Sequence, residues 1–186
     1  MSRGRLTLLL LVVALVLSAW LAWRPTDAPP PPLAADGTPM PDYYLTGLTL
    51  QDYAPDGTLS RVLRTERMSH ITDDGTALVQ PQLTLENSQG SPWVITGERG
   101  QLNPGGDTLT LPDQVQITRL ATPDNRPLRL TTSNLRVRPA EGYAETDEAV
   151  TVVSNGDRID AVGLKAWLQG PARIHFNSQV KGHYEP

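Results

Sequence analysis

The stretch Leu109–Ile117, LTLPDQVQI, decides the fold class of this chain. Apolar and polar residues alternate in Leu109-Thr110-Leu111 and again in Val115-Gln116-Ile117, as in a β-strand with one buried and one wet face. Segments rich in Gly, Pro, Asn and Asp separate such runs, and no amphipathic helix of three turns follows Tyr43. The pattern predicts an all-β domain of many short antiparallel strands, either a sandwich, a jelly roll or a barrel. The same alternation recurs at Leu48–Leu50, Leu83–Leu85 and Leu128–Leu130.

A weak internal repeat includes the same stretch. Three segments place a Val six positions after an apolar residue, with a turn-prone middle: Leu109–Val115, Ala144–Val150 and Ile174–Val180. A matching strand start precedes each Val, at Ile95, Leu130 and Ile159. Units of two or more short strands stack on their neighbours into a continuous sheet pair. Such an array ends in two open strand edges.

Composition limits the class of protein. The chain has 186 residues, a net charge of −4 and no cysteine. Residues 43–186 suffice for one domain with a hydrophobic core, held by packing and sheet hydrogen bonds without disulfides. A bacterial lipoprotein anchor is also excluded, because it needs a cysteine to acylate. The mildly acidic balance disfavours binding to nucleic acid and broad adsorption to anionic lipid surfaces.

The N-terminal stretch Leu6–Trp23, LTLLLLVVALVLSAWLAW, contains no charge and is just long enough to cross a membrane as a helix. Arg3 and Arg5 precede it and only Arg24 follows, so residues 1–5 are expected in the cytoplasm. A cleaved signal peptide is the alternative, but the exit lacks a small-x-small cleavage site and carries bulky indoles. We expect an uncleaved anchor, with apolar and interfacial contacts from Leu6, Leu11, Leu17, Trp20 and Trp23.

The proline-rich segment 24–42 follows the anchor. Proline-rich chains favour an extended polyproline II conformation, so this linker is able to span on the order of 50 Å. We interpret it as a spacer between the membrane and the domain at 43–186.

The sequence offers little for catalysis. His70, His175 and His183 are the only histidines, and without cysteine they do not complete a zinc site. Asp157 follows Asn155-Gly156 in a predicted turn and, with Asp160, resembles neither a calcium loop nor an acid pair. Phosphate-binding glycine loops and a G-x-S-x-G nucleophile motif are absent from the sequence. We therefore expect no enzymatic activity, no cofactor and no metal.

Two features suggest binding. One is a set of aliphatic residues expected to face inward, which either fill a closed core or line a gap for acyl chains. Its members are Leu48, Leu50, Leu63, Ile71, Leu83, Leu85, Ile95, Leu109, Leu111, Val115, Ile117 and Leu130, together with Leu135 and Val137. The other is a basic cluster, which is either a solvated sheet face or a docking surface for a phosphorylated or acidic partner. It comprises Arg119, Arg126, Arg129, Arg136 and Arg138.

The order of these parts resembles that of the LptC family, the bitopic component of the bacterial lipopolysaccharide export bridge. The resemblance covers nearly the whole chain: a short basic N-terminus, one anchor, a proline-rich tether and an all-β domain. It rests within the domain on YYLTGLTL at Tyr43–Leu50, Asp56-Gly57, a strand near Leu63–His70, Ala77–Pro81, Trp93–Ile95 and Glu98-Arg99-Gly100. The internal repeat resembles the OstA-type unit of related periplasmic bridge proteins.

This resemblance implies a twisted, open β-jelly roll, anchored in the bacterial inner membrane, whose apolar groove holds lipid A acyl chains. It also implies that the anchor packs against the LptB2FG transporter, which spends the ATP, and that lipopolysaccharide passes on to LptA. The N-terminal edge would meet the transporter through Tyr43, Tyr44, Leu45 and Gly47. The C-terminal edge strand would bind LptA by β-augmentation, through Arg173, Ile174, Phe176, Val180 and Tyr184. The alternative is a closed β-sandwich that tethers an envelope complex and binds no lipid.

Overall fold

The computed structural model describes residues 41–71, 74–87, 90–123 and 125–184. The expected anchor at 6–23 and nearly all of the linker lie outside these residues. Within the described part, no helix has the length and apolar character needed to cross a membrane.

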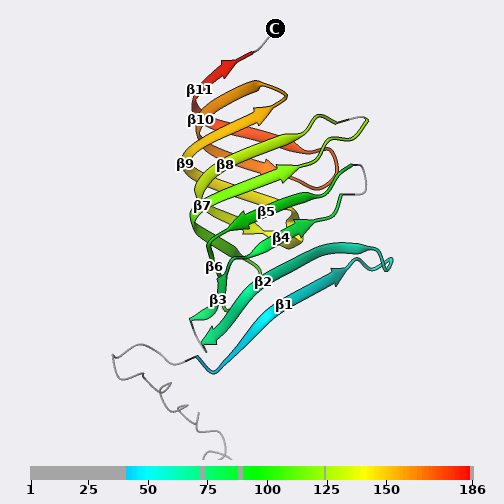
Figure 1. Cartoon of the computed structure of the whole chain (residues 1–186), viewed down its shortest axis with the longest axis vertical. Helices are drawn as coiled ribbons and strands as arrows, with labels where there is room; N and C mark the ends of the chain where they lie inside the picture. Colours follow the sequence, from blue (N-terminus) through cyan, green and yellow to red (C-terminus); the bar gives the residue numbers. More distant parts are fainter. Residues whose placement is uncertain (1–40, 72–73, 88–89, 124, 185–186) are drawn as a thin grey trace, which may run out of the picture. The chain divides into compact units, whose positions relative to one another are not determined.

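The described residues form one antiparallel sheet of eleven strands, which confirms the all-β prediction (Figure 1). A 3-10 turn, η1, spans Pro139–Glu141. The strands are β1 Tyr43–Tyr53, β2 Leu59–Ile71, β3 Gly75–Val79, β4 Gln82–Leu85, β5 Trp93–Gly97, β6 Arg99–Leu102, β7 Leu109–Arg119, β8 Leu128–Arg138, β9 Tyr143–Ser154, β10 Asp157–Trp167 and β11 Arg173–His183.

The long strands bend, so that each contributes to two legs of a roll. One half of β2 pairs with β4 and the other half with β3. Similarly, β7 pairs with β6 through Leu109 and Thr110 and with β5 through Val115–Arg119. The pairs β3/β4 and β5/β6 are therefore the halves of two bent strands, interrupted at Gln80-Pro81 and at Glu98. The roll encloses its apolar side chains between the two legs.

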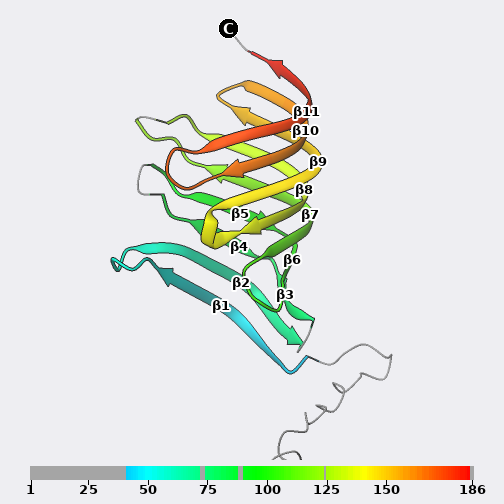
Figure 2. The ribbon, with the colours of Figure 1, turned by 180° about the vertical axis from the view of Figure 1, so that it is seen from behind.

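The C-terminal half is a simple meander in which β7, β8, β9, β10 and β11 pair in sequence order (Figures 1 and 2). The repeat found in the sequence corresponds to this arrangement. Its three units supply the neighbouring strand pairs β5–β7, β8–β9 and β10–β11. The turn-prone middle of each unit lies within β7, β9 and β11, away from the hairpin loops.

Bulges mark the bend in several strands. Asn134 in β8 and Gly163 in β10 have left-handed backbones, with φ of 48° and 75°, and the strand register shifts at both places. A β-bulge inserts one unpaired residue, bends the strand and reverses which side chains face inward. Glycine suits position 163 for a second reason, because a Cβ there would collide with the Asn177 side chain of β11.

The core is almost entirely aliphatic and includes one fully buried indole. Trp93 in β5 is 1% exposed and lies among leucines, isoleucines and valines from β3 to β10. Among its largest fully buried members are Leu78, Leu85, Ile95, Leu109, Leu111, Ile117, Leu130, Leu135, Leu164 and Leu168. Burial of these side chains, worth about 1.5–3 kcal/mol each, replaces the disulfides that the chain lacks.

Both ends of the sheet are edge strands. Within the described residues, β1 pairs only with β2, and β11 pairs only with β10. Every residue of β1 is exposed except Leu48, which is half-buried. An unpaired edge presents free backbone donors and acceptors and is able to accept a further strand.

Asp160 in β10 is expected to give the domain part of its acid sensitivity. Arg158 donates two hydrogen bonds to its carboxylate, each 2.8 Å long, and Thr151 Oγ1 donates a third at 2.7 Å. These donors lower the pKa of Asp160 to about 2. Because the carboxyl group of the unfolded chain titrates near pH 4, this stabilisation is present above about pH 4 and is lost as the pH falls towards 2.

We therefore expect Asp160→Asn to flatten the dependence of the urea midpoint on pH between about 4 and 2. The control Glu66→Gln removes an exposed carboxylate that makes no ion pair within the described residues, so its curve should follow that of the unmodified protein. Parallel curves for Asp160→Asn and the unmodified protein would contradict the assignment.

Candidate functional site: an apolar pocket at the β1 end of the roll

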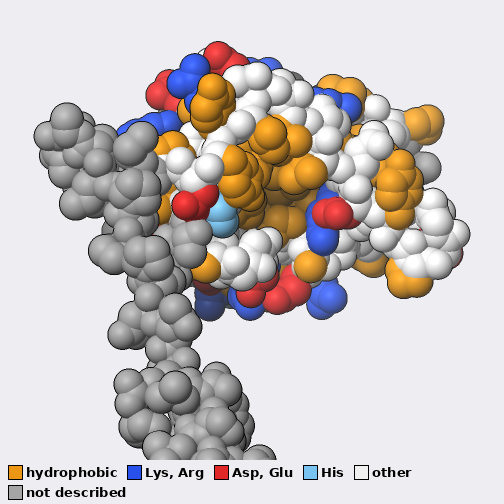
Figure 3. All heavy atoms as spheres, turned by 90° about the horizontal axis from the view of Figure 1, so that it is seen from below, with side chains coloured by type: hydrophobic (Ala, Val, Ile, Leu, Met, Phe, Trp, Pro, Cys, Tyr) orange, Lys and Arg blue, Asp and Glu red, His pale blue; other side chains and the backbone are white. Residues whose placement is uncertain are grey.

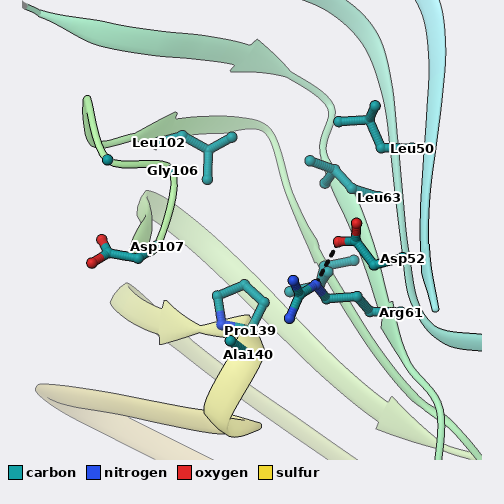
Figure 4. Close-up of a pocket in the computed structure, with 11 residues that line it drawn as sticks. Leu50, Asp52, Arg61, Leu63, Leu102, Gly106, Asp107, Pro139 and Ala140 are labelled. Atoms are coloured by element: carbon teal, nitrogen blue, oxygen red, sulfur yellow. Dashed lines mark hydrogen bonds and ion pairs between the residues drawn. The ribbon is translucent and has the colours of Figure 1, made fainter. Parts of the chain in front are cut away.

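A pocket of about 290 Å³ opens at the end of the roll nearest β1. Seen from that end, hydrophobic side chains surround a hollow in the centre of the face (Figure 3). Leu50, Leu63 and Leu83 of β1, β2 and β4 form one wall. Leu102 and the turn at 105–107 lie opposite, and Pro139 and Ala140 of η1 complete the lining (Figure 4). The pocket is therefore apolar inside and assembled from both legs of the roll.

Charged groups lie at the margins of this pocket. Arg61 Nε donates to Asp52 Oδ2 at 2.6 Å, across the β1–β2 pair. Asp107 accepts hydrogen bonds from Asn103 Nδ2 at 2.6 Å and Thr108 Oγ1 at 3.1 Å, and these donors lower the pKa of its carboxyl group. Exposed ion pairs contribute little stability. An apolar interior with a charged margin suits an amphiphile whose tail is buried and whose headgroup stays wet.

The aliphatic residues predicted to face inward divide into three groups. Ten are at most 2% exposed and belong to the closed core: Leu83, Leu85, Ile95, Leu109, Leu111, Val115, Ile117, Leu130, Leu135 and Val137. Leu48, Leu63 and Ile71 are half-buried, and Leu50 is 45% exposed. The pocket brings together Leu50, Leu63 and Leu83. Sequence reasoning missed Leu102, Pro139 and Ala140, because only the folding of the roll places these strand-end and turn residues opposite β2.

The residues predicted for the two edges lie on or beside the edge strands. Tyr43, Tyr44 and Leu45 are exposed at the start of β1, and the Tyr43 ring stacks on His70 of β2 with centroids 5.0 Å apart. Gly47 has a φ of 64°, a left-handed conformation within β1. On the other edge, Ile174 and Phe176 pack against the core, whereas Arg173, Val180 and Tyr184 are exposed.

The basic cluster divides into separate environments. Arg136 pairs with Glu145 and Asp147, Arg138 with Glu141, and Arg126 with Asp157, all at 3.4–3.5 Å. Arg129 is exposed on β8, as the alternation predicts. Arg119 differs from all of these, because it is half-buried and lies over the Trp93 ring at 4.9 Å.

A small network on the outer face surrounds Tyr143. Its hydroxyl donates to Glu145 Oε2 at 2.9 Å, and this bond lowers the pKa of Glu145. Burial raises the pKa of Tyr143 itself. Arg138 lies over the Tyr143 ring at 4.5 Å, and Trp167 packs beside it at 5.3 Å. These side chains are one another's hydrogen-bonding and packing partners, so we interpret them as a structural cluster.

The described residues contain no group of three or more His, Asp or Glu side chains arranged to hold a metal ion. His70 instead shares a 2.9 Å hydrogen bond with Thr76 Oγ1. The pocket therefore offers shape and apolar surface, and its lining residues do not form a nucleophile–base pair.

The family model described as "Lipopolysaccharide-assembly, LptC-related" matches residues 8–185. The chain belongs to the LptC family. The LptC family takes part in lipopolysaccharide assembly, which agrees with the resemblance stated from the sequence. Its role is one of transport and not of catalysis, in agreement with the expectation that this member is not an enzyme.

Among solved structures, this LptC-family chain is similar to LptH from Pseudomonas aeruginosa, described as the LptA homologous periplasmic component of the conserved lipopolysaccharide transport device. The sequences are 10% identical, the match covers 79% of this chain and 96% of LptH, and the TM-score is 0.45. A comparison with curated proteins found no matching sequence.

Proposed function

We propose that this LptC-family protein is the inner-membrane-anchored periplasmic component of a lipopolysaccharide transport bridge, which accepts lipopolysaccharide from LptB2FG and passes it to LptA. The observation that carries the proposal is the apolar pocket at the β1 end, whose lining includes the core residue Leu83. Family membership supports a role in lipopolysaccharide transport. The hydrophobic stretch Leu6–Trp23 supplies the single-pass anchor and holds the domain on the periplasmic side.

The energetics favour a protein-lined route for such a lipid. Each methylene removed from water is stabilised by about 0.8 kcal/mol, so a lipid with several acyl chains does not cross an aqueous compartment unaided. A pocket lined by Leu50, Leu63 and Leu102 shields acyl carbon from water. The headgroup remains at the margin, where Asp52, Arg61 and Asp107 already hold charge in contact with solvent.

The two edge strands are the surfaces through which we propose that neighbouring proteins join the roll. Tyr43, Tyr44, Leu45 and Gly47 on β1 would meet the periplasmic part of LptB2FG. At the other end, LptA would add a strand to β11, with Arg173, Ile174, Phe176, Val180 and Tyr184 at the contact. Main-chain hydrogen bonds supply affinity in such β-augmentation, and side chains supply specificity. Joining edges in this way extends the apolar interior from one protein to the next.

Site-specific photo-crosslinking in membranes tests the proposal. A photoreactive amino acid at Leu63 or Leu102 is suitable because both are half-buried in the pocket, whereas Leu83 and Ile95 are too deeply packed to accept a bulky probe. The same probe at exposed Arg129 is the control. We expect lipopolysaccharide adducts at Leu63 and Leu102 that increase with ATP, and none at Arg129.

Assembled, folded protein without pocket adducts would overturn the lipid-conduit proposal. The closed tether would then be the better interpretation, because ten of the aliphatic residues predicted to face inward are packed into the core and are at most 2% exposed.

A further inference from the structure

Arg119 is an inward-facing arginine at the end of β7. It is paired in register with Trp93 of β5 and with Leu128 of β8. It lies two residues beyond Ile117, which is 1% exposed, so both side chains project from the inner face of the strand. Its guanidinium group lies over the ring of Trp93, which is a member of the buried core. The remaining arginines of the basic cluster have their charged ends on the outside.

Arg119 is only partly satisfied by hydrogen bonds. Its Nη2 donates to the carbonyl of Arg126 at 3.1 Å, but its buried Nε has no hydrogen-bond partner. The buried indole N–H of Trp93 and the buried hydroxyl of Thr122 are also unpartnered. Within the described residues, no carboxylate forms an ion pair with Arg119. Native proteins satisfy nearly all buried polar groups, so these three unpartnered groups at one end of β5 and β7 require an explanation.

A small cavity of about 160 Å³ lies beside this arginine. Three connections meet around it: β4–β5, β7–β8 and β10–β11. Asn87 Nδ2 of the first connection donates to the carbonyl of Gly170 in the third, at 3.3 Å, and so joins the two. The described lining contains no acidic side chain and comprises Asn87, Gly90, Arg119, Asn125, Gly170, Pro171 and Ala172. The volume equals that of about five water molecules in the liquid, enough for one tetrahedral oxyanion.

We propose that this cavity, the Arg119 site, binds a phosphate group, with Arg119 as the charged ligand and the amides of Asn87 and Asn125 beside it. A guanidinium fork matches two oxygens of a phosphate, and such charge-assisted bonds are stronger than neutral ones. The Trp93 ring packs against one face of the Arg119 guanidinium group and restricts its orientation. The site also supplies local positive charge in a domain that is acidic overall.

The assignment of this phosphate to a lipid headgroup rests on the proposed function. The Arg119 site shares Asn87 and Gly170 with a larger polar cavity of about 470 Å³, which is lined by Ser60 and Glu86 among others. The carboxylates of Asp56 and Glu86 line that larger cavity, whereas the described lining of the Arg119 site has no acidic side chain. A phosphorylated headgroup whose acyl chains lie inside the roll is therefore expected to place its phosphate at Arg119. Free inorganic phosphate is the other possible source.

The test uses the full-length chain in detergent with ¹⁵N-labelled tryptophan, so that the indole N–H of Trp93 reports on the site by NMR. The probes are lipid A bearing its phosphates, the same lipid A after dephosphorylation, and inorganic phosphate. We expect phosphorylated lipid A to shift the Trp93 signal, and Arg119→Gln to weaken its binding about 10-fold, as loss of one charge-assisted contact predicts. Dephosphorylated lipid A should bind both proteins equally.

Two further variants make the test specific. Arg119→Lys keeps the charge but not the fork, and should lie between the unmodified protein and Arg119→Gln. Arg129→Gln removes an exposed arginine from the neighbouring strand and should bind as the unmodified protein does. Thermal unfolding of each variant confirms that the roll remains folded.

The outcomes separate the two proposals. If Arg119→Gln binds phosphorylated lipid A as tightly as the unmodified protein, the Arg119 site is overturned and the lipid conduit stands. If the unmodified protein binds neither lipid, the proposed function fails. A Trp93 shift with inorganic phosphate alone would then support the Arg119 site as a site for free phosphate, and no shift with any probe would overturn it.

Discussion

Replacing Leu63 by aspartate is expected to weaken lipopolysaccharide binding by about 100-fold or more while leaving the roll folded. Leu63 is half-buried in β2 and lies in the wall of the apolar pocket, so the new carboxylate remains hydrated when the pocket is free (Figure 4). When acyl chains fill the pocket, that carboxylate loses its water without gaining a partner, which costs several kcal/mol. Binding to the full-length protein in detergent, followed with fluorescent lipopolysaccharide, measures the effect.

Two variants control for hydrophobicity and charge. Leu63→Met conserves volume and apolar character and should bind within a few-fold of the unmodified protein. Val153→Asp adds the same charge at a valine of β9 that is 39% exposed and lines neither the apolar pocket nor the Arg119 site, and should bind normally. Equal binding by Leu63→Asp and Val153→Asp would refute the role of the pocket.

Truncating Leu111 to alanine is expected to lower the free energy of unfolding by about 3 kcal/mol. Leu111 is 1% exposed in β7. Its Cδ2 atom occupies space beside Gly97 and Gly100, only 3.3 and 3.1 Å from where a Cβ would stand on each. The two glycines thus let the bent β5–β6 pair approach β7 closely, and the leucine fills the resulting space. Domains of this kind have a total stability of about 5–15 kcal/mol, so the loss is a large fraction.

Urea unfolding followed by tryptophan fluorescence measures this change. The matched control is Leu120→Ala, which removes the same atoms from an exposed side chain and should change stability by less than about 0.5 kcal/mol. A loss below about 1 kcal/mol for Leu111→Ala would mean that the roll collapses readily around the vacated space, in conflict with the tight packing described here.

The alternation of apolar and polar residues was sufficient to predict an all-β domain, but not the way its strands bend. In β8 the buried positions are Leu130 and Thr132 before the bulge at Asn134, and Leu135 and Val137 after it. The inward-facing set thus changes from even to odd positions within one strand. A local period of two carries no information about such a reversal, because the bulge is fixed by pairing with a distant strand.

In the candidate sites too, strand alternation predicted some residues, whereas others are brought in only by the folding of the roll. Leu50, Leu63 and Leu83 were predicted from their strands, whereas Leu102 and Pro139 join them only because the β6 end and η1 lie across the roll. Arg119 was grouped in the sequence with four other arginines. Its distinct position depends on Trp93, which lies 26 residues earlier in the sequence and adjacent in the sheet. The sequence did contain a signal for this position of Arg119. The alternation of Val115, Ile117 and residue 119 along one strand places all three side chains on the inner face.

The meander and its unprotected outermost strands have a consequence for local stability. Strands β8, β9 and β10 each have two paired neighbours, whereas β1 has one and buries almost nothing of its own. Backbone amides in such a strand open at a much lower free energy than those of the core, so the most frequent partial unfolding detaches β1 alone. A protein that docks there must therefore order β1 as it binds. Part of the binding free energy is used to order β1. The complex therefore dissociates more readily than its buried area alone would suggest.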